Sequence, residues 1–170
     1  MKLGLLPLAL ATGVLIGAGV LVAVVVGADG GGGGSLQGYF DRLSTAQTEI
    51  NEEYSAISTQ YANAFAEKQE TLDYLNASAD AWGDSTAKLE DIDPPEEAEA
   101  AHATLVQATG DVREAFLALS ASAEEADDTE EALTALLDTA DTTAFDDYGT
   151  ACADMQTLAD SSGVIVQLPC

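Results

Sequence analysis

The sequence is poor in the residues from which enzymes and metal sites are built. It has one histidine, His102, and two cysteines, Cys152 and Cys170, among 170 residues. A single histidine excludes a histidine-rich metal cluster and any catalytic pair that needs two histidines. No G-x-S-x-G, Walker, H-E-x-x-H or calcium-loop pattern occurs. The sequence therefore predicts a protein that is not an enzyme and that uses no cofactor.

Basic residues are also scarce, with five Lys and Arg against 30 Asp and Glu and a net charge of −25. Residues 29–170 hold all thirty acids and only four bases, so that this part alone has a formal charge of −26; the bases are Arg42, Lys68, Lys88 and Arg113. Such a charge repels nucleic acid and anionic lipid headgroups, and it favours cations or a protein partner with a basic surface. We expect no nucleic-acid partner.

The acidic composition has two interpretations that the sequence leaves open. Charged side chains normally coat the outside of a protein, so the acids can mean only a solvated surface. Abundant Asp, Glu, Ala and Thr with three lysines also fit a halophilic protein. In that case, high salt would screen the repulsion between carboxylates.

The first 28 residues contain no acid and one charged side chain, Lys2. The uncharged run after Lys2 is longer than the ~20 residues that cross a bilayer, whereas a cleaved signal usually has an apolar region of only ~7–15 residues. We therefore expect residues 1–28 to form a signal-anchor or transmembrane helix, with Lys2 in the cytoplasm. The alternative is a signal peptide cut after Ala28, which would make the protein secreted.

Glycine-rich residues 29–35 are typical of a flexible linker. The predicted protein is thus a single-pass protein of the cell membrane. Residues 1–28 bind the membrane, residues 29–35 form the linker, and residues 36–170 form an acidic domain outside the cytoplasm.

From Leu36 onward, apolar residues recur at alternating steps of three and four, the spacing of one helical face. The stripe shifts around Ala62, Asn63 and Ala64, where we expect a bend or a break. No strand-like alternation occurs before residue 164. The prediction is an all-α fold, an antiparallel helical bundle with a short extended C-terminal tail. Four helices are expected, or alternatively a long helical hairpin or three-helix form that folds at Pro94.

A helix corner is marked by "DIDPPEE". Asp93 is suited to cap a new helix, Pro94 fits its first position, and Glu96 is the reciprocal acid of a capping box. Pro95 follows directly. The sequence therefore predicts a third helix that begins at about residue 94.

The segment "EEADDTEE" collects carboxylates between two predicted helices. Asp127, Asp128 or Thr129 is suited to cap the last helix. The cluster could also gather divalent cations weakly through oxygen ligands; its members are Glu124, Glu125, Asp127, Asp128, Glu130 and Glu131. The alternative is a solvated helix junction.

The last ten residues, "SSGVIVQLPC", predict a tail that doubles back. Gly163 is suited to end the final helix. Seven extended residues span about 23 Å, which exceeds the ~15 Å rise from Cys152 to the helix end. Cys170 can thus reach Cys152, and Ile165, Val166 and Leu168 are expected to cover the bundle. In an exported chain the two cysteines predict a disulfide, which stabilises by about 3 kcal/mol.

His102 lies just after the proline corner. We expect it at the surface or its boundary, paired with Glu99 or with an acid on a facing helix.

The segments "DIDPPEEAEAAHATL" and "CADMQTLADSSGVIVQLPC", within residues 91–170, resemble a pattern found in exported helical proteins of bacteria and archaea that have no assigned role. The residues that match are Pro94, Pro95, His102, Leu105, Cys152 and Cys170. The resemblance implies a helical extracytoplasmic domain with a bridged C-terminus, and no activity.

Three functions remain as hypotheses. The first is a membrane-anchored, non-catalytic domain with an interaction or envelope-structural role. The second is an extracytoplasmic module that binds or senses a small ligand or cation. The third is a subunit of a surface filament, which would require a leader cut after Gly4.

Overall fold

A computed structural model describes residues 35–140 and 142–169. These residues form five α-helices and no strand; the helices are α1 (Leu36–Gln60), α2 (Lys68–Glu90), α3 (Glu99–Glu125), α4 (Thr129–Thr139) and α5 (Thr143–Ser161). The predicted all-α class is confirmed. The predictions for residues 1–28 and for most of the linker concern residues outside this range.

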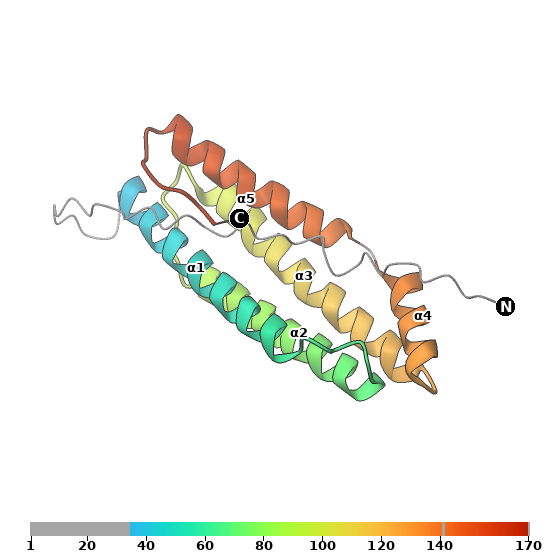
Figure 1. Ribbon diagram of the computed structural model, residues 1–170. Helices are drawn as coiled ribbons and strands as arrows, with labels where there is room; N and C mark the ends of the chain where they lie inside the picture. Colours follow the sequence, from blue (N-terminus) through green and yellow to red (C-terminus); the bar gives the residue numbers. More distant parts are fainter. Residues whose placement is uncertain (1–34, 141, 170) are drawn as a thin grey trace, which may run out of the picture.

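Four long helices lie side by side and alternate in direction along the chain (Figure 1). They are α1, α2, α3 and α5, whereas the short α4 lies at the far end of α3 and leads into α5. The start of α1, the α2–α3 corner and the end of α5 therefore share one end of the bundle. None of the helices in the described part of the chain combines the length and the apolar character that a membrane span needs.

The bend or break expected around Ala62, Asn63 and Ala64 is found as a break, because α1 ends at Gln60 and residues 61–67 form a turn. The α2 helix then folds back along α1, where the hydroxyls of Tyr54 and Tyr74 lie 3.1 Å apart. The backbone at the turn is held by Thr71, whose hydroxyl donates to the Ala64 carbonyl at 2.7 Å. The alternative prediction, a long hairpin that folds only at Pro94, is therefore wrong.

The predicted proline corner is only partly correct. The chain does turn there, but α3 begins at Glu99, and its N-cap residue Ala98 makes no side-chain capping bond. The carbonyl of Pro95 instead accepts a hydrogen bond from the Ala98 amide at 2.8 Å. A proline disfavours helical geometry in the residue before it, so the paired prolines delay the helix and Asp93 does not cap it.

The expected last helix is divided into α4 and α5, with residues 140–142 between them. Asp128 caps α4 as predicted, since its Oδ1 accepts from the Glu131 amide at 2.9 Å. The break lets α4 turn across the end of the bundle, where Ala132 and Leu136 pack against the end of α3. A threonine-rich junction helps to end α4, because β-branched residues are weaker helix formers than alanine.

The core consists of two clusters stacked along the bundle. The first, which we call the strap-end core, joins α1, α3 and α5 to residues that follow α5; among its members are Phe40, Leu43, Leu105, Met155 and Leu168. The second, the α4-end core, lies around Trp82 and Phe116 and includes the buried side of α4. Tyr148 packs against both clusters.

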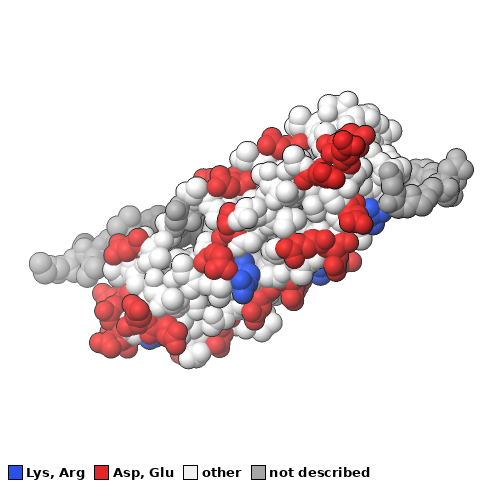
Figure 2. All heavy atoms as spheres, turned by 180° about the vertical axis from the view of Figure 1, so that it is seen from behind, with Lys and Arg blue, Asp and Glu red and all other residues white. Residues whose placement is uncertain are grey.

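Carboxylates cover the exterior of this core. Of the 28 Asp and Glu residues that the structure describes, 27 are exposed and Glu53 is half-buried. Figure 2 shows acidic side chains along the whole of one face, with few basic ones between them. The acids contribute a charged shell, and none of them enters the interior.

Candidate functional site

The end of α5 is a Schellman turn, as the position of Gly163 predicts. Gly163 has φ +72°, in the left-handed region that favours glycine. Its amide bonds to the Asp160 carbonyl at 3.2 Å, and the Val164 amide bonds to the Ala159 carbonyl at 3.0 Å. The turn reverses the chain and directs the buried Val164 into the strap-end core.

Residues 164–169, which we call the strap, run back between α1 and α5 (Figure 1). Gln156 of α5 holds the strap with both ends of its side-chain amide. Its Nε2 donates to the Val166 carbonyl at 3.1 Å, and its Oε1 accepts from the Leu168 amide at 2.8 Å. The amide thus pairs with the strap as the backbone of a neighbouring strand would.

The α1 helix holds the strap from the other side. Ser44 donates to the Gln167 carbonyl at 3.3 Å, and Asn51 donates to the Pro169 carbonyl at 2.6 Å. Three polar side chains from two helices therefore bind four backbone groups of a segment that has no regular secondary structure.

The burial of the strap alternates along the chain. Val164 and Leu168 are buried and Val166 is half-buried, but Ile165 is 90% exposed. The expectation that Ile165 covers the bundle is therefore wrong. Successive side chains of an extended segment point to opposite sides, and the Schellman turn places Val164 inward, so Ile165 must point outward.

Cys152 lies beneath the strap on α5 and is completely buried. No cysteine in the described part of the chain is free. Its expected partner, Cys170, lies outside the described residues, although the adjacent Pro169 is bonded to α1. The pairing of Cys152 with Cys170 therefore stays a prediction.

Gln47 is a buried polar residue between the two cores, 1% exposed. The Tyr148 hydroxyl donates to its Oε1 at 3.3 Å, and Cys152 Sγ lies 3.6 Å from the same oxygen. Burial raises the pKa of Tyr148 to about 12, although the hydrogen bond to Gln47 opposes this rise. Tyr148 is thus a neutral hydrogen-bond donor at physiological pH.

His102 is buried rather than at the surface, with 6% of its area exposed. Its Nδ1 lies 2.9 Å from the Tyr39 hydroxyl, so the predicted pairing with Glu99 or another acid is wrong. Burial lowers the pKa of His102, and a hydrogen bond with the Leu89 backbone partly offsets the effect. The histidine therefore joins α1, α2 and α3 as a neutral, hydrogen-bonded core residue.

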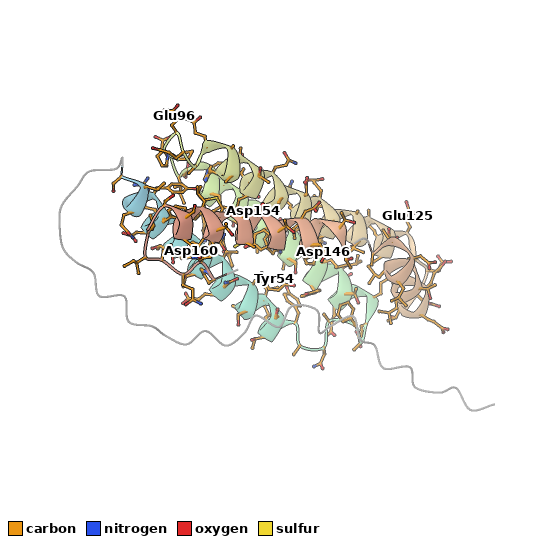
Figure 3. All side chains as sticks on the ribbon, turned by 90° about the horizontal axis from the view of Figure 1, so that it is seen from above. Tyr54, Glu96, Glu125, Asp146, Asp154 and Asp160 are labelled. Atoms are coloured by element: carbon orange, nitrogen blue, oxygen red, sulfur yellow. The ribbon has the colours of Figure 1, made fainter. Side chains whose placement is uncertain are left out.

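The predicted cation cluster is not assembled. Within residues 35–140 and 142–169, no three His, Cys, Asp or Glu side chains are grouped so that they could hold a metal ion. Two acids of the cluster take part in capping instead, because Asp128 caps α4 and Glu131 Oε2 accepts from the Asp127 amide at 2.7 Å. In Figure 3, Glu125 of this cluster and Glu96 of the corner lie at opposite ends of the bundle.

Sequence reasoning did not find a shallow groove of about 490 Å³ between α3 and α5. Its lining combines small side chains with three carboxylates; it comprises Ala103, Thr104, Gln107, Ala108, Asp111, Asp147, Thr150, Ala151 and Asp154. Figure 3 shows Asp154 on α5 between Asp146 and Asp160. The groove has a floor of small side chains and acidic edges. The sequence signal for it is weak, because it consists only of alanines on two helices that are far apart in the chain.

The four basic residues outside the N-terminal segment are all engaged within the chain. Lys88 pairs with Glu53 at 3.3 Å and Glu49 at 3.7 Å. The other three bond to a carboxylate or to backbone carbonyls: Arg113 to Glu114 at 2.8 Å, Arg42 to the Asp93 carbonyl at 3.3 Å, and Lys68 to the carbonyls of Glu124 and Ala126. Exposed ion pairs of this kind add little stability. Because the few bases are already engaged within the chain, most of the acids face solvent.

A scan against models of protein families, a search of curated proteins and a search of solved structures each found no match to this chain.

Proposed function

We propose that this chain is a membrane-anchored, non-catalytic interaction domain outside the cytoplasm, which presents an acidic surface to a partner with a basic surface. The observation that carries the proposal is the distribution of charge. Of 28 described carboxylates, 27 are exposed, whereas the four bases are engaged within the chain. Such a field attracts a basic partner and speeds its encounter.

The α3–α5 groove is the part of this surface best shaped for contact. Its alanine floor lets a partner approach the two helices closely, and Asp111, Asp147 and Asp154 can pair with lysine or arginine side chains. The proposed non-catalytic role is supported by the burial of His102, whose side chain bonds to Tyr39 inside the core.

The membrane anchor and the extracytoplasmic location rest on the sequence of residues 1–28 and on the predicted Cys152–Cys170 disulfide, which an oxidising compartment would favour. A cation or small-ligand sensor is less well supported, because the α3–α5 groove and the hollow between α1 and the end of α2 are both open and shallow. The filament hypothesis depends on residues outside the described range.

The proposal can be tested with a photo-crosslinking amino acid at Thr150, in the groove, on intact source cells. The expected result is one dominant crosslinked protein with a basic surface, which disappears when Asp111, Asp147 and Asp154 are changed to Asn. A matched control changes three exposed acids of α2, Asp73→Asn, Asp80→Asn and Asp84→Asn, and should keep the crosslink.

Equal loss in both triple variants would mean that only net charge matters and that the groove is not the contact. No crosslinked partner, or a partner retained by the groove variant, would refute the interaction assigned to this surface.

A further inference from the structure

Buried polar groups lie where the strap-end core meets the α4-end core. Gln47 and Trp82 are 1% and 8% exposed, and they come from α1 and α2 respectively. Tyr148 of α5 touches both of them. Its hydroxyl donates to Gln47 Oε1 at 3.3 Å, and its ring meets the Trp82 ring edge-on with 5.0 Å between the ring centres.

Two of these groups are donors without an acceptor. Gln47 Nε2 and Trp82 Nε1 are buried and make no hydrogen bond in the described structure. Ser78, one helical turn before Trp82 on the same face of α2, has a hydroxyl in the same condition. A buried donor that has lost its water and gained no partner is costly, so three such groups in one part of a bundle require an explanation.

Reorienting the Gln47 amide does not remove the problem. If its oxygen and nitrogen are exchanged, Nε2 reaches the Tyr148 hydroxyl and the amide oxygen becomes the atom without a partner. The Tyr148 hydroxyl oxygen could in principle accept from the Trp82 N–H, but the indole nitrogen makes no such hydrogen bond in the described structure.

The chemistry of the donors defines the occupant. Gln47 Nε2 and Trp82 Nε1 only donate, so the missing group must accept two hydrogen bonds. It must also be neutral, because the surroundings are apolar and the domain carries a large excess of negative charge. Gln47 and Trp82 line neither the α3–α5 groove nor the hollow between α1 and the end of α2, so neither of these two hollows opens onto the donors. A water molecule is the smallest neutral group that accepts two hydrogen bonds.

We propose that the junction of the two cores holds one buried water molecule, which accepts hydrogen bonds from Gln47 Nε2 and Trp82 Nε1. Proteins contain about one buried water per 27 residues, typically on polar groups that lack other partners. Such a water links α1 to α2 beside Tyr148 of α5, and its hydrogens remain available to nearby oxygens such as the Ser78 hydroxyl.

Trp82 makes this proposal testable, because it is the only tryptophan of the chain and its indole N–H gives a single NMR signal. In the nitrogen-labelled full chain, magnetisation transfer from water to this proton should give a direct cross-peak with the sign of a long-lived bound water. Absence of the cross-peak, or one explained by exchange of the indole proton alone, would overturn the proposal.

Single substitutions distinguish loss of the bound water from a general change in packing. Gln47→Met removes one of the two donors with little change in size and should abolish the cross-peak. Gln107→Met, on the exposed side of α3, should leave it intact. If Gln47→Met does not fold, Tyr148→Phe provides the second test: it deletes only a hydroxyl, and the cross-peak should persist. Its loss would assign the water to Tyr148 and contradict the pairing proposed here.

Discussion

Replacing the Leu168 side chain of the strap with alanine is expected to destabilise the whole domain. Leu168 is 5% exposed and belongs to the strap-end core. Replacing a buried leucine with alanine costs about 2–5 kcal/mol, depending on how far the surroundings collapse. Because the strap is a short surface segment that can settle inward, we expect Leu168→Ala to cost about 2–3 kcal/mol, near the lower limit of that range.

Ile165 supplies a matched control within the same strap. It is an aliphatic side chain of equal size, three residues away, and 90% exposed. Changes at such surface positions usually lie within about 0.5 kcal/mol of neutral. The expected contrast between the two variants is therefore roughly 2 kcal/mol or more.

Unfolding of the full chain, followed by the fluorescence of the single tryptophan, measures the contrast. For a domain of this size the expected loss corresponds to a fall in Tm of roughly 6–15 °C for Leu168→Ala. Equal and small effects of the two substitutions would show that the strap lies on the bundle without stabilising it. A larger effect at Ile165 would reverse the orientation assigned to the strap.

Three other predictions follow from caps and buried groups. Burial lowers the pKa of His102, so the unfolded chain, with a pKa of about 6.5, takes up the proton first. The contribution of His102 to the free energy of unfolding should thus be fully present above pH ~6.5 and fall as the pH drops below it. Unfolding curves of the two proteins at several pH values should show a smaller loss of stability at low pH for His102→Gln. Asp128→Ala removes the cap of α4 and should cost about 1 kcal/mol in denaturant unfolding. Asp127→Ala removes the same charge and no cap, so an equal cost would contradict the capping role. Gly163→Ala should cost about 1–2 kcal/mol through its positive φ alone, because an added methyl group meets nothing within 4 Å. At Gly149, inside α5 and equally open, the same change should stabilise the protein by about 0.5–1 kcal/mol; a similar loss at both positions in calorimetry would count against the Schellman turn.

Much of the helical body could be predicted from local sequence. Apolar spacing located the long helices, and the shift of the stripe marked the turn after Gln60. Asp128 and Gly163 act as predicted because capping depends on the residue itself and on the few backbone groups next to it. Chain length alone also predicted that the tail could return along α5.

The errors concern features that depend on packing between distant segments. His102 follows a charged corner, yet its ring fits beside Tyr39, 63 residues earlier in the chain. The side on which Ile165 lies depends on the register that the Schellman turn imposes, so the apolar character of the tail did not reveal it. The break between α4 and α5 depends on how α4 covers the end of a core, which periodicity along one helix does not describe.

The candidate site was less predictable than the fold. The α3–α5 groove brings together Ala108 and Ala151, which are distant in sequence and have side chains too small to stand out in a pattern. The strap is held by Ser44, Asn51 and Gln156, polar residues that are ordinary on a helix surface and acquire their role only when an extended backbone lies beside them.

The central proposal is that the acidic domain is anchored outside the cytoplasm and that a disulfide between Cys152 and Cys170 joins the end of the chain to α5. Intact mass of the protein isolated from its source, without reductant, tests both parts together. We predict a mass that includes residues 1–28 and is two hydrogens below that of the reduced chain, with Cys152 and Cys170 in one linked peptide after digestion. A mass that lacks residues 1–28 would contradict the membrane anchor. Two thiols that react with an alkylating reagent would contradict the disulfide between Cys152 and Cys170.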